Sequence, residues 1–201
     1  MEILTKFKEI NIITLGDGKV GKSSFIVRYM DDRFSSNYLS TIGIDLKVKN
    51  IKTSNGDEVR LKIYDTVGQE RYKSIAENYI KRADGIIFVY DITEESSFYS
   101  IKNWIKSVDN GNQNHLPYII VGNKSDLEED RVISKEKGEK LAKSFNIEGH
   151  FYETSCSNGD NIKEAVNDIV EQVYSIIKDR KSVQNIKLLT KEKPKKNCCK
   201  S

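Results

Sequence analysis

The octapeptide GDGKVGKS, from Gly16 to Ser23, decides the predicted fold. It fits the pattern G-x-x-x-x-G-K-[ST], and it lies between an apolar run typical of a strand and a segment predicted to be helical. Glycines let the backbone wrap around an anion so that successive N–H groups point at it, and the N-terminus of the following helix adds its dipole. In this pattern Lys22 would bridge the β- and γ-phosphates, and Ser23 would hold Mg²⁺. The stretch therefore predicts a nucleoside triphosphate site, but it does not identify the base.

Apolar runs alternate with helical patterns along the rest of the chain. Residues 10–15 read as a first strand, and the continuous apolar runs at 86–90 and 118–121 are typical of strands covered on both faces. Apolar residues recur at helical spacing within 98–108, 141–145 and 162–173, and Ser134 is a plausible N-cap for the middle helix. This alternation predicts an α/β fold with a mostly parallel sheet.

Two stretches, residues 44–48 and 59–63, depart from this rule because apolar and polar residues alternate in both. The intervening SNGD, residues 54–57, is a hairpin signal. We therefore predict an antiparallel pair at one sheet edge, with one face partly open to solvent. From Asp179 onward the periodicity fades and lysines accumulate, which predicts a domain over residues 1–178 and a flexible basic tail over residues 179–201.

The composition fits one soluble globular domain with a tail, since 37% of the 201 residues are hydrophobic and 31% are charged. The net charge of +3 gives no case for a nucleic-acid binder. Residues 1–9 contain no signal-peptide core, and no apolar run approaches the roughly 20 residues needed to span a bilayer. The three cysteines do not suggest a secreted disulfide framework, so we expect a reducing cytosol.

The base is predicted to be recognised by NKSD, Asn123 to Asp126, which directly follows the apolar run that ends at Val121. A carboxylate such as that of Asp126 can accept hydrogen bonds from N1–H and the amino group of guanine. Adenine lacks this pair of donors and would leave a buried carboxylate unpaired. Because nucleotides bind at the carboxyl edge of open α/β sheets, this position favours guanine recognition.

The segment DTVGQER, residues 65–71, predicts the γ-phosphate side of the site. Asp65 ends a strand and is placed to support Mg²⁺ through water, while Gly68 supplies an N–H for the γ-phosphate. Gln69 can orient the attacking water. Thr41, in the polar stretch before the hairpin, could close over Mg²⁺ and the γ-phosphate. Arg71 belongs to this segment, and the sequence contains no evident arginine finger supplied in cis, so fast hydrolysis should need an activating protein.

These motifs together resemble a Ras-superfamily small GTPase over nearly the whole chain, and within it the Rab family. The Rab resemblance is carried by the segments STIGIDLK, RLKIYDTVGQERYKSI, YIKRADG and FVYDIT. The resemblance implies a P-loop GTPase domain with a six-stranded sheet, five helices and two nucleotide-sensitive segments. It also implies Mg²⁺ with bound GTP or GDP, Phe34 packing against guanine, and support of the base by Ser155 and backbone N–H groups in TSC, residues 154–156. Cys156 thereby has a local structural role.

The predicted site falls into four groups. The phosphate contacts are Gly16, Asp17, Gly18, Lys19, Val20, Gly21, Lys22, Ser23, Ser24, Thr41 and Gly68. The guanine contacts are Phe34, Asn123, Lys124, Asp126, Ser155 and Cys156. The metal contacts are Ser23, Thr41 and Asp65, and the catalytic residue is Gln69.

Several positions depart from the family pattern. Lys19 stands where small residues are common, and Val67 replaces the usual alanine, which puts the intrinsic rates of hydrolysis and exchange in question. Leu46 and Tyr64 replace the Phe and Trp that usually form an effector-facing cluster with an aromatic matching Tyr79. Effector identity therefore cannot be inferred from the family. Trp104 is predicted to be core packing, without a functional role.

The paired cysteines Cys198 and Cys199 in the lysine-rich end KPKKNCCKS allow three interpretations. A disulfide between neighbours would be strained and has no oxidising compartment, and two thiolates alone make a poor zinc site. The remaining interpretation is lipidation, and Rab proteins commonly carry two geranylgeranylated cysteines at this place. Two lipid chains make anchoring stable, and the nearby lysines would strengthen binding to an anionic leaflet.

The sequence as a whole predicts a monomeric molecular switch for vesicle or organelle traffic, on the cytoplasmic face of an intracellular membrane with a cytosolic pool. The resemblance implies an exchange factor, a GTPase-activating protein, prenyl-escort and GDP-dissociation-inhibitor type proteins, and GTP-dependent effectors. Two rival functions are a metabolic kinase, for which no acceptor site or lid is evident, and a binding module that holds GTP without hydrolysing it.

Overall fold

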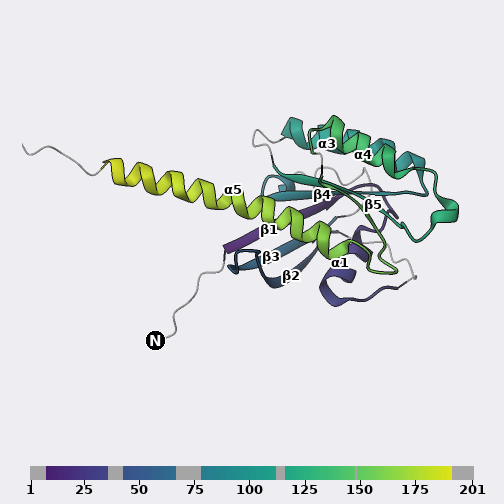
Figure 1. The fold of residues 1–201 in the computed structure, drawn as a ribbon, viewed down its shortest axis with the longest axis horizontal. Coiled ribbons are helices and arrows are strands. Elements are labelled where there is room, and N and C mark those ends of the chain that lie inside the picture. The colour runs from purple at the N-terminus through teal and green to yellow at the C-terminus, as the bar shows by residue number, and fades with distance from the viewer. Residues whose placement is uncertain (1–7, 36–42, 67–77, 112–115, 148, 192–201) are drawn as a thin grey trace, which may run out of the picture.

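The structure is a computed structural model that describes residues 8–35, 43–66, 78–111, 116–147 and 149–191. The described residues form one sheet with helices on both faces (Figure 1). In chain order the elements are β1 (Lys8–Leu15), α1 (Lys22–Asp31), β2 (Asp45–Lys52), β3 (Glu58–Asp65), β4 (Gly85–Asp91), α3 (Glu95–Gly111), β5 (Tyr118–Asn123), the 3₁₀ helix η2 (Glu128–Asp130), α4 (Lys135–Ser144), β6 (Phe151–Thr154) and α5 (Ile162–Lys191). Residues 78–80 are also helical.

The sheet has the strand order β2-β3-β1-β4-β5-β6. Only β2 and β3 pair in the antiparallel sense, and the other neighbouring strands are parallel. This confirms the predicted fold class, with β2 at the edge. Because β3 and β4 lie on opposite sides of β1, the connections diverge there. The carboxyl ends of the strands at such a point are where open α/β sheets bind ligands.

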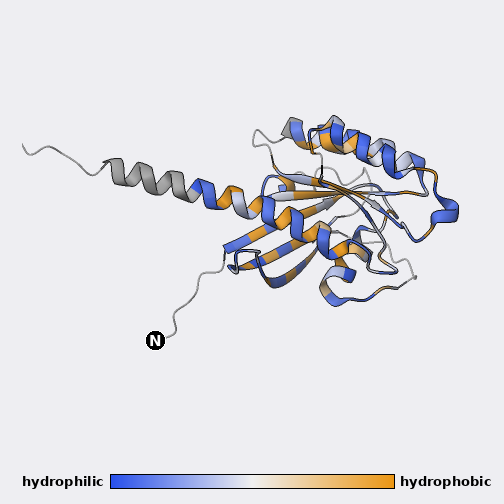
Figure 2. Cartoon of the chain, in the orientation of Figure 1, coloured by the Kyte–Doolittle hydropathy of each residue, from blue (hydrophilic) through white to orange (hydrophobic). Residues whose placement is uncertain are grey.

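Two apolar clusters cover the two faces of the sheet. One packs α1 and α5 against the sheet, and its members include Ile10, Phe25, Leu61 and Val166. The other packs α3 and α4 against the opposite face, and its members include Leu15, Phe88, Ile101 and Leu141. Figure 2 shows hydrophobic residues along the central strands of the sheet, while α3 and α4 carry many hydrophilic residues. All seven residues of β4 are buried, as expected for a strand covered on both faces.

The β2–β3 hairpin is antiparallel, as predicted, but the apolar residues that alternate along β2 face solvent while those of β3 face the core. Val59, Leu61 and Ile63 are fully buried, whereas Leu46 is 43% and Val48 is 50% exposed. The turn uses Gly56 in a left-handed conformation, with φ of +80°. One face of this edge pair is therefore open to solvent.

The last helix differs from the prediction, because α5 continues to Lys191 instead of giving way to an irregular tail at Asp179. Residues 179–191 contain neither glycine nor proline, so no residue interrupts the helical hydrogen bonding. Residues 192–201, with Cys198 and Cys199, lie outside the described residues. None of the helices in the described part of the chain is long and apolar enough to cross a membrane.

Candidate nucleotide-binding site

The phosphate loop, residues 16–21, connects β1 to α1. Gly16 has φ of +147° and Gly21 has φ of +96°, both in the range that favours glycine. A Cβ atom on Gly16 would lie 2.1 Å from the carbonyl oxygen of Val89, and one on Gly21 would lie 2.2 Å from Nδ2 of Asn123. Backbone conformation and space therefore both require glycine at these two positions of the loop.

The middle of this loop contains a residue in a less favourable conformation. Lys19 has φ of +66°, which costs a non-glycine residue roughly 1–2 kcal/mol. Gly18 and Lys19 are exposed, whereas Val20 is buried. The loop thus presents its middle to solvent while Val20 joins the core beneath it.

Lys22 lies buried at the start of α1, inside the phosphate loop. Its Nζ donates hydrogen bonds to the carbonyl oxygens of Gly16 at 2.9 Å and Asp17 at 2.7 Å. Burial lowers the pKa of Lys22 to about 8, although the carboxylates of Asp65 and Asp17 act in the opposite direction. A cation thus lies beside the N-terminus of α1, next to a loop whose glycines carry no side chains. This arrangement fits a bound phosphate group.

The predicted metal contacts that the structure describes come from α1 and β3. Ser23 belongs to the first turn of α1, next to Lys22, with Ser24 following it. Asp65 is the last residue of β3, and its side chain is buried. A hydroxyl and a carboxylate are hard oxygen donors of the kind that Mg²⁺ prefers alongside phosphate oxygens and water. The residues present therefore fit this metal.

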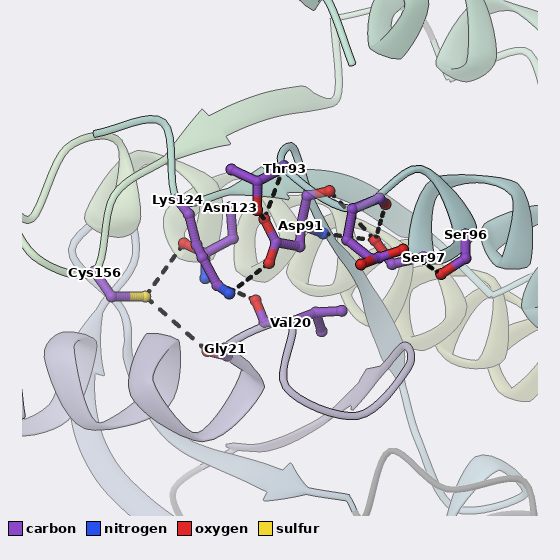
Figure 3. Close-up of polar contacts among 10 residues, drawn as sticks. Val20, Gly21, Asp91, Thr93, Ser96, Ser97, Asn123, Lys124 and Cys156 are labelled. Carbon is purple, nitrogen blue, oxygen red and sulfur yellow. Dashed lines mark hydrogen bonds and ion pairs between the residues drawn. The ribbon is translucent and has the colours of Figure 1, made fainter. Parts of the chain in front are cut away.

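Asn123 connects the phosphate loop to the segment after β6, which is predicted to contact guanine and is called the guanine-side loop below (Figure 3). Its Nδ2 donates to the carbonyl oxygen of Val20 at 2.9 Å. Its Oδ1 accepts from the hydroxyl of Thr154 at 3.1 Å and from Sγ of Cys156 at 3.3 Å. The side chain is 1% exposed, so its amide atoms are used within the protein. Asn123 therefore holds three segments of the site together.

Lys124 follows Asn123 with a left-handed backbone, φ +69°. Its ammonium forms an ion pair with the buried carboxylate of Asp91, at the end of β4 (Figure 3). The N–H and the hydroxyl of Thr93 also donate to Oδ1 of Asp91, at 2.9 and 2.7 Å. Sequence reasoning assigned no role to Asp91, which orients Lys124 through these contacts. The sequence could have indicated this role of Asp91, because Asp91 is the last residue of β4. In the parallel sheet β4 is adjacent to β5, and Lys124 directly follows β5.

Asp126 and Ser155 come from separate loops and meet directly. The Ser155 hydroxyl donates to Oδ1 of Asp126 at 2.6 Å, and it also accepts from the N–H of Asn158 at 3.0 Å. Ser155 is fully buried, whereas Asp126 is exposed. The two loops predicted to recognise guanine are thus adjacent, and the Asp126 carboxylate is held at the surface.

Arg28 is a further site residue that sequence reasoning missed. From α1 its Nε donates to the carbonyl oxygen of Cys156 at 2.7 Å, and its Nη2 donates to that of Ser157. It also pairs with Asp32 one helical turn later. No sequence signal could identify these contacts, because the acceptors are main-chain atoms of a distant loop. Arg28 therefore holds the guanine-side loop to α1.

Cys156 is buried between these elements. Burial raises the pKa of its thiol to about 11, and the hydrogen bond to Asn123 only partly opposes this. A protonated, buried thiol is a poor nucleophile. The structure therefore agrees with a packing role and not with a reactive one.

The remaining predicted residues are exposed or fall outside the description. Phe34 is 46% exposed, and its packing against guanine remains a prediction. Thr41, Val67, Gly68, Gln69 and Arg71 belong to segments 36–42 and 67–77, which lie outside the described residues.

Known proteins resemble this chain over most of its length. Residues 11–175 match the model of the Ras family. Ras-related protein Rab-13 of Mesocricetus auratus is 40% identical over 162 residues, covering 81% of this chain and 78% of the relative. Ras-related protein SEC4 of Saccharomyces cerevisiae is 40% identical over 174 residues, covering 87% and 79%. Ras-related protein Rab-8B of Homo sapiens is 42% identical over 154 residues, covering 77% and 73%.

The fold, the phosphate loop and these similarities define a small GTPase of the Ras family, a class of enzymes that hydrolyse GTP. Within that family, the chain belongs to the Rab small GTPases.

Proposed function

We propose that this chain is a guanine-nucleotide switch that recruits effectors to an intracellular membrane when it holds GTP. The supporting observation is the position of Asn123, whose amide group binds Val20 of the phosphate loop as well as Thr154 and Cys156 on the guanine side. One side chain thereby joins the segments proposed to hold the two halves of the nucleotide. GTP or GDP is the proposed ligand, with Mg²⁺.

Each residue has a distinct role in this proposal. Lys22 supplies a buried cation to the phosphates, and the oxygens of Ser23, Thr41 and Asp65 support the metal. Mg²⁺, when bound, neutralises charge on the phosphate oxygens. Asp126 accepts from the donors of guanine, and Gln69 orients the attacking water. Thr41 and Gly68 bind the γ-phosphate, so hydrolysis releases the segments that contain them.

The first experiment identifies the nucleotide. The protein is purified with Mg²⁺ and denatured, and the released nucleotide is separated by chromatography. We expect mostly GDP, because Asp126 selects guanine and the protein hydrolyses GTP. Retained GTP would favour the binding module that does not hydrolyse it and would make Val67→Ala the next variant. Adenine nucleotide, or none, would contradict the proposed site.

The catalytic role is tested by Gln69→Leu in a single-turnover assay. We expect the variant to load GTP normally but to hydrolyse it markedly more slowly, because leucine cannot orient water. Normal loading is the internal control, since it shows that the phosphate loop is intact. An unchanged rate would remove Gln69 from its assigned role.

Membrane attachment is proposed to use Cys198 and Cys199, with the basic residues before them. The domain of residues 1–178 would then reach the membrane through residues 179–201, which are helical as far as Lys191. In cell fractionation, Cys198→Ser with Cys199→Ser should move the protein from membranes to cytosol. Cys198→Ser alone is the intermediate control, because one lipid chain binds only marginally. Persistent membrane association of the double variant would defeat this part of the proposal.

Effector binding is proposed for the open face of the β2–β3 hairpin. Leu46 and Tyr64 are cross-strand partners there, and the rings of Tyr64 and Tyr79 lie 5.3 Å apart. Leu46 and the neighbouring Val48 are exposed.

The proposed regulators are an exchange factor, a GTPase-activating protein, and prenyl-escort and GDP-dissociation-inhibitor type proteins.

A further inference from the structure

Trp104 makes a polar contact that its packing role does not require. It is the single tryptophan of the chain, lies on α3, and is 8% exposed within the cluster that covers one face of the sheet. Its indole Nε1–H donates a hydrogen bond to Oδ1 of Asp17 at 2.8 Å. Asp17 belongs to the phosphate loop, so the contact leads from the apolar core directly to the site.

The phosphate loop is held at Asp17 from two sides. The side chain of Asp17 accepts from Trp104, and its main-chain carbonyl oxygen accepts from Nζ of Lys22 at 2.7 Å. The helix that carries Trp104 covers the face of the sheet opposite to α1 (Figure 1). Because the phosphate loop continues into α1, the hydrogen bond from Trp104 joins this loop to the helices on the other face of the sheet.

The charge of Asp17 gives this contact its importance. A carboxylate in a loop that binds phosphate repels the bound anion, and a carboxylate free to turn toward the site would do so most strongly. A hydrogen bond from an N–H group to a carboxylate is charge-assisted and therefore stronger than a neutral one. The indole thus keeps the Asp17 carboxylate turned toward α3 and stabilises the loop in one conformation.

We propose that Trp104 is a positioning residue that acts through Asp17 to slow the release of nucleotide from the phosphate loop. The proposal rests on nucleotide binding at the site described above. It concerns a side chain that is not among the predicted nucleotide contacts.

The test measures the rate of GDP release from full-length protein loaded with a fluorescent GDP analogue. Trp104→Phe retains a large aromatic ring but removes the N–H donor, so release should become about threefold to tenfold faster. Tyr99→Phe is the matched control, because it removes one exposed hydrogen bond, to Glu95, from the same helix. The control should release GDP at the wild-type rate. An unchanged rate in Trp104→Phe would overturn the proposal.

A double-mutant cycle separates positioning from packing. In an Asp17→Ala background the acceptor is absent, so Trp104→Phe should cause no further change in release. In an Asp17→Asn background the side-chain oxygen can still accept, but it carries no charge that would repel the phosphate, so the effect of Trp104→Phe should be smaller than in the wild type. Equal effects of Trp104→Phe in all three backgrounds would show that it acts through packing alone, and the proposal would fail.

The contact itself has an independent readout. Because the chain has one tryptophan, its ¹H–¹⁵N spectrum should contain a single indole signal, which Asp17→Ala should shift and Tyr99→Phe should leave in place. A signal that Asp17→Ala does not move would overturn the inference, even if the wild type binds GDP. Failure of the wild type to bind guanine nucleotide would instead refute the proposed function, while the indole signal would still report on the contact.

Discussion

At the carboxyl end of the sheet, buried or half-buried side chains donate to main-chain carbonyls of the loops, whereas at the opposite end the β2–β3 hairpin forms hydrogen bonds with α5 mainly through side chains. Lys22, Arg28 and Asn123 together bind carbonyl oxygens of the phosphate loop and of the loop after β6. At the hairpin end, the Tyr174 hydroxyl donates to Asp57 and accepts from Nζ of Lys8. The backbone N–H of Ser54 donates to the Glu171 carboxylate at 2.5 Å.

This difference indicates how each end of the sheet affects nucleotide release and the stability of the protein. A carbonyl oxygen held by a buried donor restricts the loop backbone, so losing the donor should change both nucleotide release and stability. A contact between side chains near the surface adds stability without determining the shape of the site. The two ends should therefore respond differently to substitution.

The largest effect is expected for Asn123→Ala. Removing its amide leaves the Val20 carbonyl oxygen and the buried Thr154 hydroxyl without this partner, so the free energy of unfolding should fall by about 3 kcal/mol. GDP release, followed by stopped-flow fluorescence, should become about 100-fold faster, as expected from a similar loss of loop stabilisation. Asn158→Ala is the matched control, because Asn158 is exposed and its side-chain amide bonds only the neighbouring Asp160 at 3.3 Å. If Asn123→Ala released GDP at the wild-type rate, the carboxyl end of the sheet would not control release more than the hairpin end does.

Cys156 tests whether the guanine-side loop is closed. With Cys198→Ser and Cys199→Ser, it is the only remaining cysteine. Because burial raises the pKa of its thiol from 9.0 to about 11, the thiolate population near neutral pH should be about 100-fold smaller than that of a free thiol. Alkylation measured by mass spectrometry should be slower by at least that factor in the native protein, and should accelerate as pH rises toward 11. Rapid native labelling at neutral pH, equal to that in denaturant, would show that the loop opens.

Arg28→Lys should have a smaller effect on the same loop. Lysine cannot reproduce the two donors that bind the carbonyl oxygens of Cys156 and Ser157, so GDP release should become about tenfold faster. Arg82→Lys, at an exposed position, is the control and should leave release unchanged. Equal release rates in the two variants would mean that Arg28 does not restrain the site.

The smallest effect is expected at the hairpin end. Tyr174→Phe retains the buried ring but removes the hydroxyl that joins Asp57 and Lys8, so the free energy of unfolding should fall by about 1 kcal/mol. Chemical denaturation measures this change, and GDP release should stay at the wild-type rate. Faster release would show that the hairpin end is coupled to the site, against the comparison drawn above.

Much of the fold follows from local patterns. The phosphate loop between strand and helix, the edge hairpin and the Ser134 N-cap of α4 each depend on residues close in sequence, and the structure contains all three. The extent of α5 did not follow, because its apolar pattern fades before its helical hydrogen bonding ends at Lys191. Hydrophobic periodicity reports burial, and a helix that leaves the domain no longer requires a buried face.

The sequence by itself determined that a phosphate loop lies near the start of a mostly parallel α/β domain, and that the residues predicted to bind guanine follow at the same sheet edge. Motifs carry this information because glycine, lysine and aspartate are required there by backbone shape and charge. Only the tertiary structure decided how the loops are held. Arg28 and Cys156 are 128 positions apart, and Trp104 and Asp17 are 87 apart. Such contacts depend on how the helices pack against the sheet. For Arg28 the acceptor is also a main-chain carbonyl oxygen, which every residue has, so no sequence pattern could indicate it.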